Sequence, residues 1–241
     1  MAGPLEGKVA LITGASAGIG EACAYAFAAA GANVVVSARR AGRLVEIQEK
    51  LGGQAVAVPS DVRTPGDASR MVAAALDGFG KLDILVANAG IGMYGGILDH
   101  SDEDLAAMLD TNIAGTIWPI RAAIPSLLES RGDLVIVSSV AGTDARANEA
   151  VYAATKHAQM GLAKGLDREL HHQGVRVSAF CPGGVGTEFA MQPGAGRTSQ
   201  SPELKDMLRA DDVAGAIVTA VSQPRSVRTL VHRLRGLTEA D

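Results

Sequence analysis

The sequence predicts an α/β fold in which helices cover both faces of a doubly wound parallel sheet of about seven strands. Two patterns lead to this expectation: short runs of successive apolar residues recur along the chain, and stretches of helical length separate them. Such runs are typical of strands buried on both faces, and their alternation with helices produces right-handed crossovers within one sheet. No repeat or linker divides the chain, so we expect residues 1–241 to form a single domain.

The predicted strands are read from the apolar runs. They are "KVALIT" (8–13), "NVVVSA" (33–38), "QAVAVPS" (54–60), "LDILVA" (82–87), "DLVIVS" (133–138), "VRVSAF" (175–180) and a weaker "RTLVH" (228–232). Because each run is apolar at successive positions rather than at alternate ones, both faces of the sheet should be covered.

The predicted helices lie between these strands. They span 18–31, 42–52, 65–79, 102–129, 149–173 and 211–222. Ser101, followed by Asp102 and Glu103, is typical of a helix start, where acidic side chains complement the helix dipole. Pro119 falls inside the longest pattern, where it removes a backbone donor, so we expect a kink there in one continuous helix.

A long segment after the sixth predicted strand has no helical or strand pattern. Residues 188–204, "EFAMQPGAGRTSQSPEL", are rich in Gly, Pro, Ser and Gln. Long irregular loops in compact domains are usually functional or mobile. We therefore expect a lid over a bound substrate at about 188–204.

Composition excludes several classes of protein. The net charge is −4 and Lys and Arg are not gathered into one block, so nucleic acid is not an expected partner. No uncharged apolar run of 18 residues and no signal peptide are present, so no membrane segment is expected. Cys23 and Cys181 imply neither a disulfide framework nor a metal site. We expect a soluble cytoplasmic protein without a bound metal.

A glycine-rich turn follows the first predicted strand. The stretch 13–20, "TGASAGIG", spaces its glycines as G-x-x-x-G-x-G and leads into an alanine-rich helix. A strand, a glycine turn and a helix in this order direct backbone N–H groups toward a phosphate. Glycines in such a turn can also serve packing alone, and the spacing differs from G-x-G-x-x-G. We expect a Rossmann-type dinucleotide site that includes Gly14, Ser16, Gly18, Ile19 and Gly20.

The end of the second predicted strand indicates which dinucleotide binds. A carboxylate there would bind the ribose 2′-hydroxyl of NAD, whereas an arginine accommodates the 2′-phosphate of NADP. The chain has no carboxylate at this point and reads Ser37, Ala38, Arg39, Arg40. A guanidinium binds phosphate through two parallel hydrogen bonds. We expect NADP(H), with Arg39 as the main contact, Arg40 more exposed, and hydroxyl contacts from Ser16 and Ser37.

A tyrosine and a lysine lie four residues apart in "VYAATKHA" (151–158). On a helix, positions i and i+4 share one face, with Cβ atoms about 5–6 Å apart. Free tyrosine titrates near pH ~10, and an adjacent ammonium favours the phenolate. Tyr152 and Lys156 therefore have the spacing of a tuned acid/base pair, although an interface tyrosine and a solvated lysine would share it.

The motifs together resemble one family, the short-chain dehydrogenases/reductases in their single-domain form. The resemblance covers nearly the whole chain. It rests on "TGASAGIG", "SDV" (60–62), "ANAG" (87–90), the Asn of "TNIAG" (111–115), "VSSVAG" (137–142), "YAATK" (152–156) and "PGGVGT" (182–187), in the family's order. Ala87 departs from the family's usual "NNAG", and we draw no functional conclusion from this change.

The resemblance implies specific site residues. The catalytic set would be Asn112, Ser139, Tyr152 and Lys156, with Ser138 as the competing serine. Further cofactor contacts would be Asp61 and Val62 at the adenine, Asn88, Ala89 and Gly90 beside the ribose, and Pro182, Gly183, Val185 and Thr187 at the nicotinamide, with Tyr152 and Lys156.

The resemblance also implies an activity, the transfer of hydride between NADP(H) and a carbonyl or secondary alcohol of a small molecule. Tyr152 would be the acid/base, Ser139 would fix the substrate oxygen, Lys156 would bind the nicotinamide ribose, and Asn112 would hold a water linking Lys156 to solvent. Three alternatives remain: a non-catalytic NADP(H) sensor or scaffold, an NAD(H)-dependent alcohol dehydrogenase, and an epimerase or dehydratase, which would need a larger C-terminal domain.

The substrate should bind beyond the carboxyl ends of the strands. Met93, Tyr94, Phe189 and Met191 would line the pocket, and Arg146 would either meet a carboxylate or face solvent. The resemblance further implies a homotetramer, or a homodimer, that pairs through helices 102–129 and 149–173.

Overall fold

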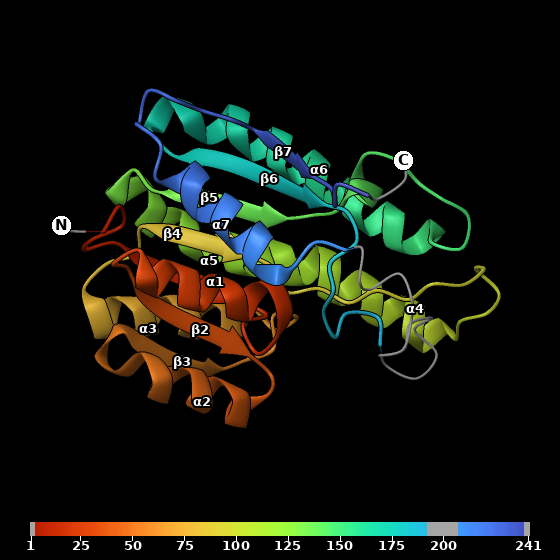
Figure 1. Ribbon diagram of the computed structural model, residues 1–241, viewed down its shortest axis with the longest axis horizontal. Helices are drawn as coiled ribbons and strands as arrows, with labels where there is room; N and C mark the ends of the chain where they lie inside the picture. Colours follow the sequence, from red (N-terminus) through yellow and green to blue (C-terminus); the bar gives the residue numbers. More distant parts are fainter. Residues whose placement is uncertain (1–2, 192–206, 239–241) are drawn as a thin grey trace.

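The sheet determines where everything else lies. The structure is a computed structural model that describes residues 3–191 and 207–238. Its seven strands form one parallel sheet in the order β3-β2-β1-β4-β5-β6-β7 (Figure 1). They are β1 (Val9–Thr13), β2 (Asn33–Ala38), β3 (Ala55–Pro59), β4 (Ile84–Ala87), β5 (Asp133–Val137), β6 (Arg176–Pro182) and β7 (Val231–Leu234). The predicted fold class is confirmed.

Helices cover the two faces of the sheet as expected (Figure 1). One face carries α1 (Gly18–Ala29), α2 (Ala41–Leu51) and α7 (Ala210–Val221). The other carries α3 (Pro65–Phe79), α5 (Gly115–Ser130) and α6 (Ala150–Leu170), and α4 (Asp102–Leu109) extends beyond the strand ends. Short 3₁₀ turns are η1 (Gly52–Gln54), η3 (Val140–Gly142) and η4 (His171–Gln173).

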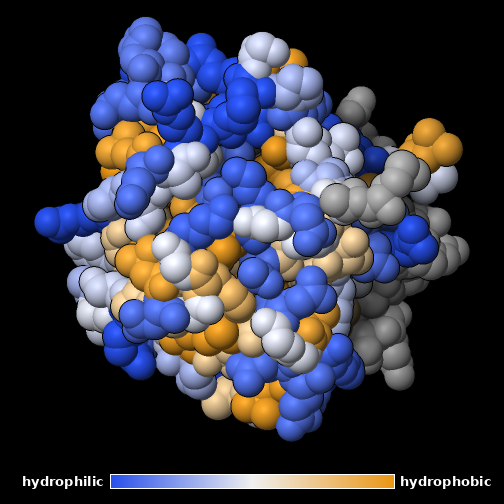
Figure 2. All heavy atoms as spheres, turned by 90° about the vertical axis from the view of Figure 1, so that its left-hand side faces the viewer, coloured by the Kyte–Doolittle hydropathy of each residue, from blue (hydrophilic) through white to orange (hydrophobic). Residues whose placement is uncertain are grey.

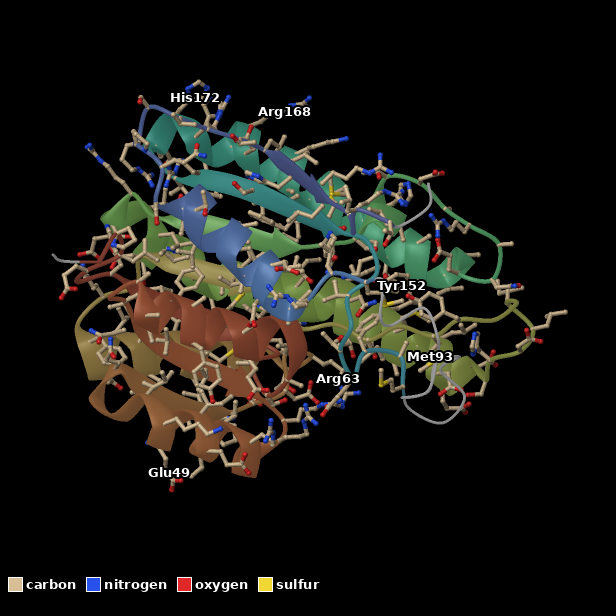
Figure 3. The ribbon with its side chains drawn as sticks, in the orientation of Figure 1. Glu49, Arg63, Met93, Tyr152, Arg168 and His172 are labelled. Carbon is tan, nitrogen blue, oxygen red and sulfur yellow. The ribbon has the colours of Figure 1, made fainter. Side chains whose placement is uncertain are left out.

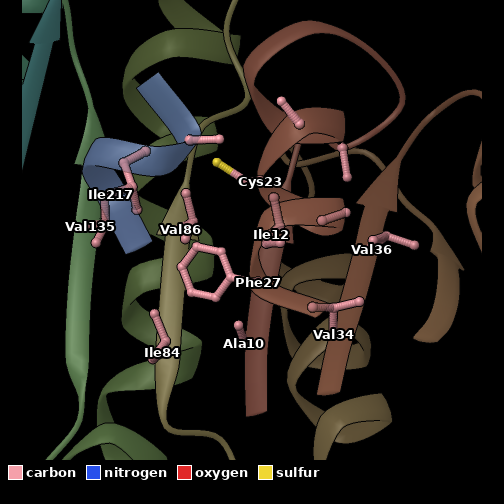
Figure 4. Close-up of a cluster of buried hydrophobic side chains, with 14 of the residues drawn as sticks. Ala10, Ile12, Cys23, Phe27, Val34, Val36, Ile84, Val86, Val135 and Ile217 are labelled. Carbon is pink, nitrogen blue, oxygen red and sulfur yellow. The ribbon is translucent and has the colours of Figure 1, made fainter. Parts of the chain in front are cut away.

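Each face has its own core. On the first face, Phe27 of α1 lies among Ile12 of β1, Val86 of β4 and Ile217 of α7, and all four side chains are fully buried (Figure 4). Burying a side chain of this size stabilises the fold by roughly 1.5–3 kcal/mol. The core fixes α1 against β1 and β4, and so fixes the turn that joins β1 to α1.

The long helical pattern at 102–129 is not one kinked helix. A π-helical turn, η2 (Asp110–Ala114), separates α4 from α5, so the irregular turn precedes Pro119 instead of coinciding with it. Pro119 lies inside α5 and is buried. A π turn widens the helix by one residue, a feature common at functional sites, and here that turn contains the fully buried Asn112.

The face that carries the amino ends of the strands is mostly hydrophilic, with hydrophobic atoms visible between polar residues (Figure 2). At these ends Arg176, at the start of β6, pairs with Asp133 of β5 at 2.6 Å. The same guanidinium donates to the carbonyl oxygens of Val221, Gln223, Pro224 and Val227. Arg176 therefore fastens the α7–β7 connection to the sheet.

None of the helices in the described ranges is both long enough and apolar enough to span a membrane.

We predict that Arg176→Met destabilises the protein by about 3–5 kcal/mol, because it removes the buried partner of the Asp133 carboxylate and the donor to several carbonyl oxygens. Arg225→Met is the matched control: Arg225 pairs with the same carboxylate at 2.9 Å, but its side chain is 47% exposed against 9% for Arg176. The control should lose about 1 kcal/mol or less. Urea unfolding measures both, and equal losses would contradict the assignment.

Candidate active site

A cleft opens at the carboxyl ends of the strands, where the strand order reverses between β1 and β4. Its volume is about 1140 Å³, which exceeds the roughly 300–1,000 Å³ of most small-ligand pockets. Tyr152 and Met93 lie at this end of the molecule, and Arg168 and His172 lie at the opposite end of α6 (Figure 3). A ligand the size of a dinucleotide with a small substrate therefore fits the cleft.

The glycine turn forms the floor of one half of the cleft. Gly14 and Gly18 have φ values of +66° and +58°, which favour glycine. A Cβ on Gly14 would lie 2.8 Å from the Cα of Ala89, and one on Gly20 would overlap the Gly14 carbonyl. Gly14 and Gly18 line the cleft, whereas Gly20 is buried beneath it and serves the packing of α1.

The amino end of α1 is free to bind an anion. Its N-cap residue, Ala17, provides no side-chain hydrogen bond to the first turn, and both Ala17 and Ile19 line the cleft. Backbone N–H groups at an uncapped helix start need an external acceptor, and the helix dipole favours a negative one. The residues present thus fit a bound pyrophosphate.

The end of β2 differs from the expectation in one residue. Ser37 is fully buried and lies below the cleft surface, and its hydroxyl has no hydrogen-bond partner in the described part of the chain. The prediction that Ser37 contacts the cofactor is therefore wrong for this geometry. In a strand, successive side chains point to opposite faces, so the residue that reaches a ligand cannot be read from the end of the run alone.

Both arginines after β2 are exposed and line the cleft, and Arg40 is bound to other residues of the cleft wall. Its guanidinium donates to the hydroxyl and the carbonyl oxygen of Ser16, each at 3.1 Å, and pairs with Glu188 at 2.9 Å. Arg39 lies beside the same half of the cleft, near Asp61. We expected Arg39 as the main contact and Arg40 as the more exposed of the two.

Three further segments converge on this half of the cleft, as the resemblance implied. Asp61 and Val62 follow β3, and hydrogen bonds from Arg63 hold the pKa of the Asp61 carboxyl below its usual value. Asn88 fastens the end of β4 to β1, since its side-chain amide donates to the Thr13 carbonyl at 2.9 Å. The remaining cleft residues of these segments are Ala89, Gly90, Pro182, Gly183, Val185 and Thr187.

Tyr152 and Lys156 lie on the same face of α6, as their spacing predicted. Both are buried, at 6% and 4% exposure, and both line the cleft. The Lys156 Nζ lies 5.7 Å from the centroid of the Tyr152 ring. Tyr94 and Phe189 flank that ring, with centroids 6.0 and 5.8 Å away. The phenol is thus held between a cation and two aromatic side chains.

The charge of Lys156 is held inside the protein. Its Nζ donates to the Val137 carbonyl at 3.1 Å and to the side-chain oxygen of Gln159 at 3.0 Å. Burial lowers the pKa of Lys156 to about 8. Below that pH the side chain is an ammonium, so its positive charge is present beside Tyr152 at neutral pH.

The two adjacent serines face different ways. Ser138 donates to the Lys156 backbone carbonyl at 3.1 Å, so it joins the end of β5 to α6. Ser139 accepts from the Ala141 backbone N–H at 3.1 Å and lies 3.5 Å from the Pro182 carbonyl oxygen. Both line the cleft, but the Ser138 hydroxyl is engaged with the helix backbone. The geometry favours Ser139 as the serine that reaches a substrate oxygen.

Asn112 lies beneath the cleft surface and not on it. Its side chain is bound to both backbone groups of Ile91, at 2.8 Å each, and to the Thr155 hydroxyl at 3.0 Å. Its backbone carbonyl accepts from Gln159 at 2.9 Å and from Thr116 at 2.7 Å. Asn112 therefore ties the loop after β4 to α6.

Sequence reasoning missed Gln159, which touches both Lys156 and Asn112. The signal was present in the spacing: residues 152, 156 and 159 are i, i+4 and i+7 on one helix face, the pattern of neighbouring side chains. All three of these residues carry polar groups on one face of a buried helix, and this pattern could have identified Gln159 as part of the site.

The other half of the cleft contains all five predicted substrate residues. Met93, Tyr94, Arg146, Phe189 and Met191 line it. Phe189 lies against Gly92, where a Cβ would come within 2.5 Å of the ring. Further lining residues that we had not predicted are Asp99, His100, Asp104, Met207 and Arg235. Most of the predicted lid, from residue 192 to 204, lies outside the described residues.

Within the described ranges, no group of three or more His, Cys, Asp or Glu side chains could hold a metal ion.

Comparisons with known proteins point to one family. Residues 8–197 match the family model for short chain dehydrogenase. An uncharacterized oxidoreductase of Staphylococcus epidermidis is 37% identical over 221 residues, which cover 91% of this chain and 93% of that protein.

Two solved structures illustrate the similarity in fold. An alcohol dehydrogenase from the archaeon Thermococcus sibiricus, complexed with 5-hydroxy-NADP, is 29% identical with a TM-score of 0.88 and covers 97% of this chain and 98% of its own. A 3-ketoacyl-(acyl-carrier-protein) reductase from Brucella melitensis, complexed with NADH, is 32% identical with a TM-score of 0.88, at 97% and 98% coverage. These similar proteins thus include one bound to an NADP derivative and one bound to NADH.

We predict that wild type gains stability relative to Lys156→Met as pH rises. The folded-state pKa of Lys156 is about 8, below the value of about 10.4 in an unfolded chain. The unfolded chain therefore binds the extra proton between these values, and stability increases with pH across that window. Between pH ~7 and pH ~10.5 the stability difference should change by about 3 kcal/mol in favour of wild type.

Chemical denaturation at several pH values measures this difference. Lys164→Met, which removes an exposed lysine from the same helix, is the control and should show no such trend. If the difference in unfolding free energy between wild type and Lys156→Met stays constant with pH, the pKa of Lys156 is not lowered by burial.

Proposed function

The chain belongs to the short-chain dehydrogenase/reductase family of oxidoreductases, and we propose that it transfers hydride between NADP(H) and a carbonyl or secondary alcohol of a small molecule. The observation that carries this proposal is the placement of Ser139, Tyr152 and Lys156 on one cleft with the glycine turn. A dinucleotide on the turn would extend along the cleft toward these three side chains.

The residues of the first half of the cleft fit a dinucleotide. The glycine turn and the uncapped start of α1 would hold the pyrophosphate, and Asp61 and Val62 would contact the adenine. Lys156 would bind the ribose next to the nicotinamide, and Pro182 to Thr187 would line the nicotinamide side. When bound, the reduced nicotinamide supplies the hydride.

Tyr152 acts as the acid in carbonyl reduction. Its hydroxyl gives a proton to the substrate oxygen as negative charge develops there, and it takes the proton back when an alcohol is oxidised. The Lys156 ammonium favours the phenolate that this leaves behind. Ser139 donates a hydrogen bond to the same oxygen and stabilises its developing charge. Burial of the pair excludes water, which strengthens both interactions.

Arg40 supports NADP(H) over NAD(H). Its guanidinium lies against Ser16 at the end of β2, where the ribose 2′ position of a bound dinucleotide would lie, and Arg39 adds a second cation. The Glu188 carboxylate opposes this preference, because it pairs with Arg40 and would repel a phosphate. An NAD(H)-dependent enzyme is therefore the second candidate. The net effect of Arg39, Arg40 and Glu188 on a 2′-phosphate decides between NADP(H) and NAD(H).

The substrate half of the cleft favours a carbonyl compound with an apolar or aromatic group. Tyr94 and Phe189 lie next to the Tyr152 ring, and Met93 and Met191 extend the apolar wall. Rings next to the reacting hydroxyl would hold a flat, apolar substituent by contact area and edge-to-face packing. Arg146 lies at the exposed margin, where it would meet a substrate carboxylate.

We further propose that copies of the chain pair through α4–α5 and α6, as a tetramer or a dimer. Small residues line the exposed side of α6, and a Cβ on Gly161 or Gly165 would meet nothing within 4 Å. A helix with such a face can approach another helix closely.

A cytoplasmic location is consistent with the free, buried thiols of Cys23 and Cys181.

We predict that Tyr152→Phe lowers kcat for carbonyl reduction at least about 100-fold while NADPH affinity changes less than about threefold, because the phenylalanine keeps the ring contacts but has no proton to give. Turnover is measured by NADPH absorbance on a panel of aldehydes, ketones and ketoacids. Binding is measured by NADPH fluorescence. A variant that keeps a tenth of the activity would rule out this role for Tyr152 and favour a non-catalytic sensor or scaffold.

We also predict that wild type binds NADPH more tightly than NADH and that Arg40→Ala weakens NADPH binding by about 10- to 100-fold, since a charge-assisted pair with the 2′-phosphate is lost. NADH affinity should stay within about threefold. Arg39→Ala, compared side by side, should have the smaller effect.

Glu188→Gln completes this set, and it should tighten NADPH binding while leaving NADH unchanged, because it frees Arg40 and removes a negative charge. Isothermal titration with both nucleotides measures all variants. Equal affinities of wild type for NADPH and NADH would contradict the NADP(H) assignment.

A further inference from the structure

We infer that Gln159 is a positioning residue of the active site, whose side-chain amide holds the Lys156 ammonium in place and connects it directly to the backbone of Asn112. The inference rests on the proposed function in one respect, that Lys156 acts on Tyr152. The side-chain amide of Gln159 contacts both the Lys156 Nζ and the Asn112 backbone carbonyl.

Both polar atoms of the Gln159 side-chain amide have hydrogen-bond partners. Its oxygen accepts from Lys156 Nζ at 3.0 Å. Its nitrogen donates to the Asn112 carbonyl at 2.9 Å and to the Thr116 hydroxyl at 2.8 Å. These partners determine which end of the Gln159 amide is the oxygen and which is the nitrogen, because an ammonium can only donate and a carbonyl can only accept. Gln159 thus bridges α6, the π turn η2 and the first turn of α5.

Packing alone does not account for a glutamine at this position. Gln159 is 2% exposed, and burying an amide costs free energy unless every polar atom finds a partner. A methionine has nearly the same shape and would fill the space without that cost. The amide is therefore explained by its partners, of which only Lys156 carries a charge.

The amide oxygen acts on the charge of Lys156. A hydrogen bond accepted from the ammonium favours the charged form, and so works against the burial that lowers the pKa of Lys156. The titratable groups that face Nζ in the described structure are Tyr152 on the same helix and Cys181 on β6. Burial raises the pKa of the Cys181 thiol, which keeps it neutral at physiological pH. No carboxylate among the described residues forms an ion pair with Lys156, so the neutral amide is its principal side-chain acceptor.

The amide also restricts where the ammonium points. The Gln159 amide is itself held by two donated hydrogen bonds and by its place on α6. The Lys156 Nζ is therefore held by two acceptors at the cleft wall, and one of its three N–H groups is not used by these two bonds. Preorganisation of this kind lowers the cost of binding a ribose hydroxyl at that point.

The test measures the pKa of Lys156 directly, by NMR of protein labelled with ¹³C-lysine, with the signal assigned by Lys156→Arg. In Gln159→Met the pKa should fall by about 1 to 2 pH units, since a charge-assisted hydrogen bond is lost. In Gln159→Glu a carboxylate faces the ammonium and the pKa should rise above the wild-type value. Opposite shifts in two variants of similar size are not produced by a packing defect.

Thr116→Val is the matched control, because it removes a buried hydrogen bond from the same amide without touching Lys156. The pKa of Lys156 should then stay within about 0.3 pH units of wild type. An unchanged pKa in Gln159→Met, or shifts of the same sign in the Met and Glu variants, would overturn the inference. If Gln159→Met does not fold, the rise in Gln159→Glu decides the question.

A turnover measurement separates this inference from the proposed function. If Gln159 acts through Lys156, the pH above which alcohol oxidation proceeds should move upward in Gln159→Met, because less ammonium is present to favour the phenolate. A shifted lysine pKa in a protein without hydride-transfer activity would sink the proposed function and keep the positioning role. If Gln159→Met keeps hydride-transfer activity and neither the pKa of Lys156 nor the pH profile shifts, the positioning role is wrong and the proposed function stands.

Discussion

The burial of one positive charge is the constraint on which the site depends. Lys156 is 4% exposed, and its ammonium lies 5.7 Å from the Tyr152 ring centroid. A charge in such a place is costly unless polar groups surround it. The Val137 carbonyl at the end of β5 and the Gln159 amide supply them. Strand β5, helix α6 and the π turn before α5 must therefore keep their relative positions for the lysine to remain charged.

The topology of the sheet supplies that arrangement. Strand β1 leads into the glycine turn, and β4, next to it in the sheet, comes about seventy residues later in the chain. Helices on both faces of the sheet lie between β1 and β4 in the chain. The carboxyl ends of the two strands nevertheless meet at the same edge of the sheet. Asn88 joins the two strand ends, and Asn112 joins the following loop to α6. The cofactor half and the reacting half of the cleft are in this way connected through the same strand ends and the same loop.

The sequence was sufficient for features that depend on local pattern. Apolar runs placed every strand of the described sheet within a few residues, and the i, i+4 spacing placed Tyr152 and Lys156 on one face. Features that depend on which way a side chain points were less accessible. Ser37 is buried under the site, and Arg40 rather than Arg39 reaches Ser16, because the strand's pleat and the following turn decide these directions.

Tertiary contacts account for the other differences. The π turn at Asp110–Ala114 has no sequence signature comparable to Pro119, and it follows from hydrogen bonds that Asn112 makes to a loop twenty-one residues away. Gln159 was identifiable by its helical spacing, but its role required the positions of Asn112 and Thr116. These contacts join segments that are distant in the chain, so local pattern could not reveal them.

The most direct measurement is the ionisation of the Tyr152 phenol, followed by NMR of protein labelled with ¹³Cζ-tyrosine in wild type and in Lys156→Met. We expect the phenolate to form at a lower pH in wild type, because the buried ammonium stabilises it. Ionisation at the same pH in both proteins would show that Lys156 does not lower the pKa of Tyr152.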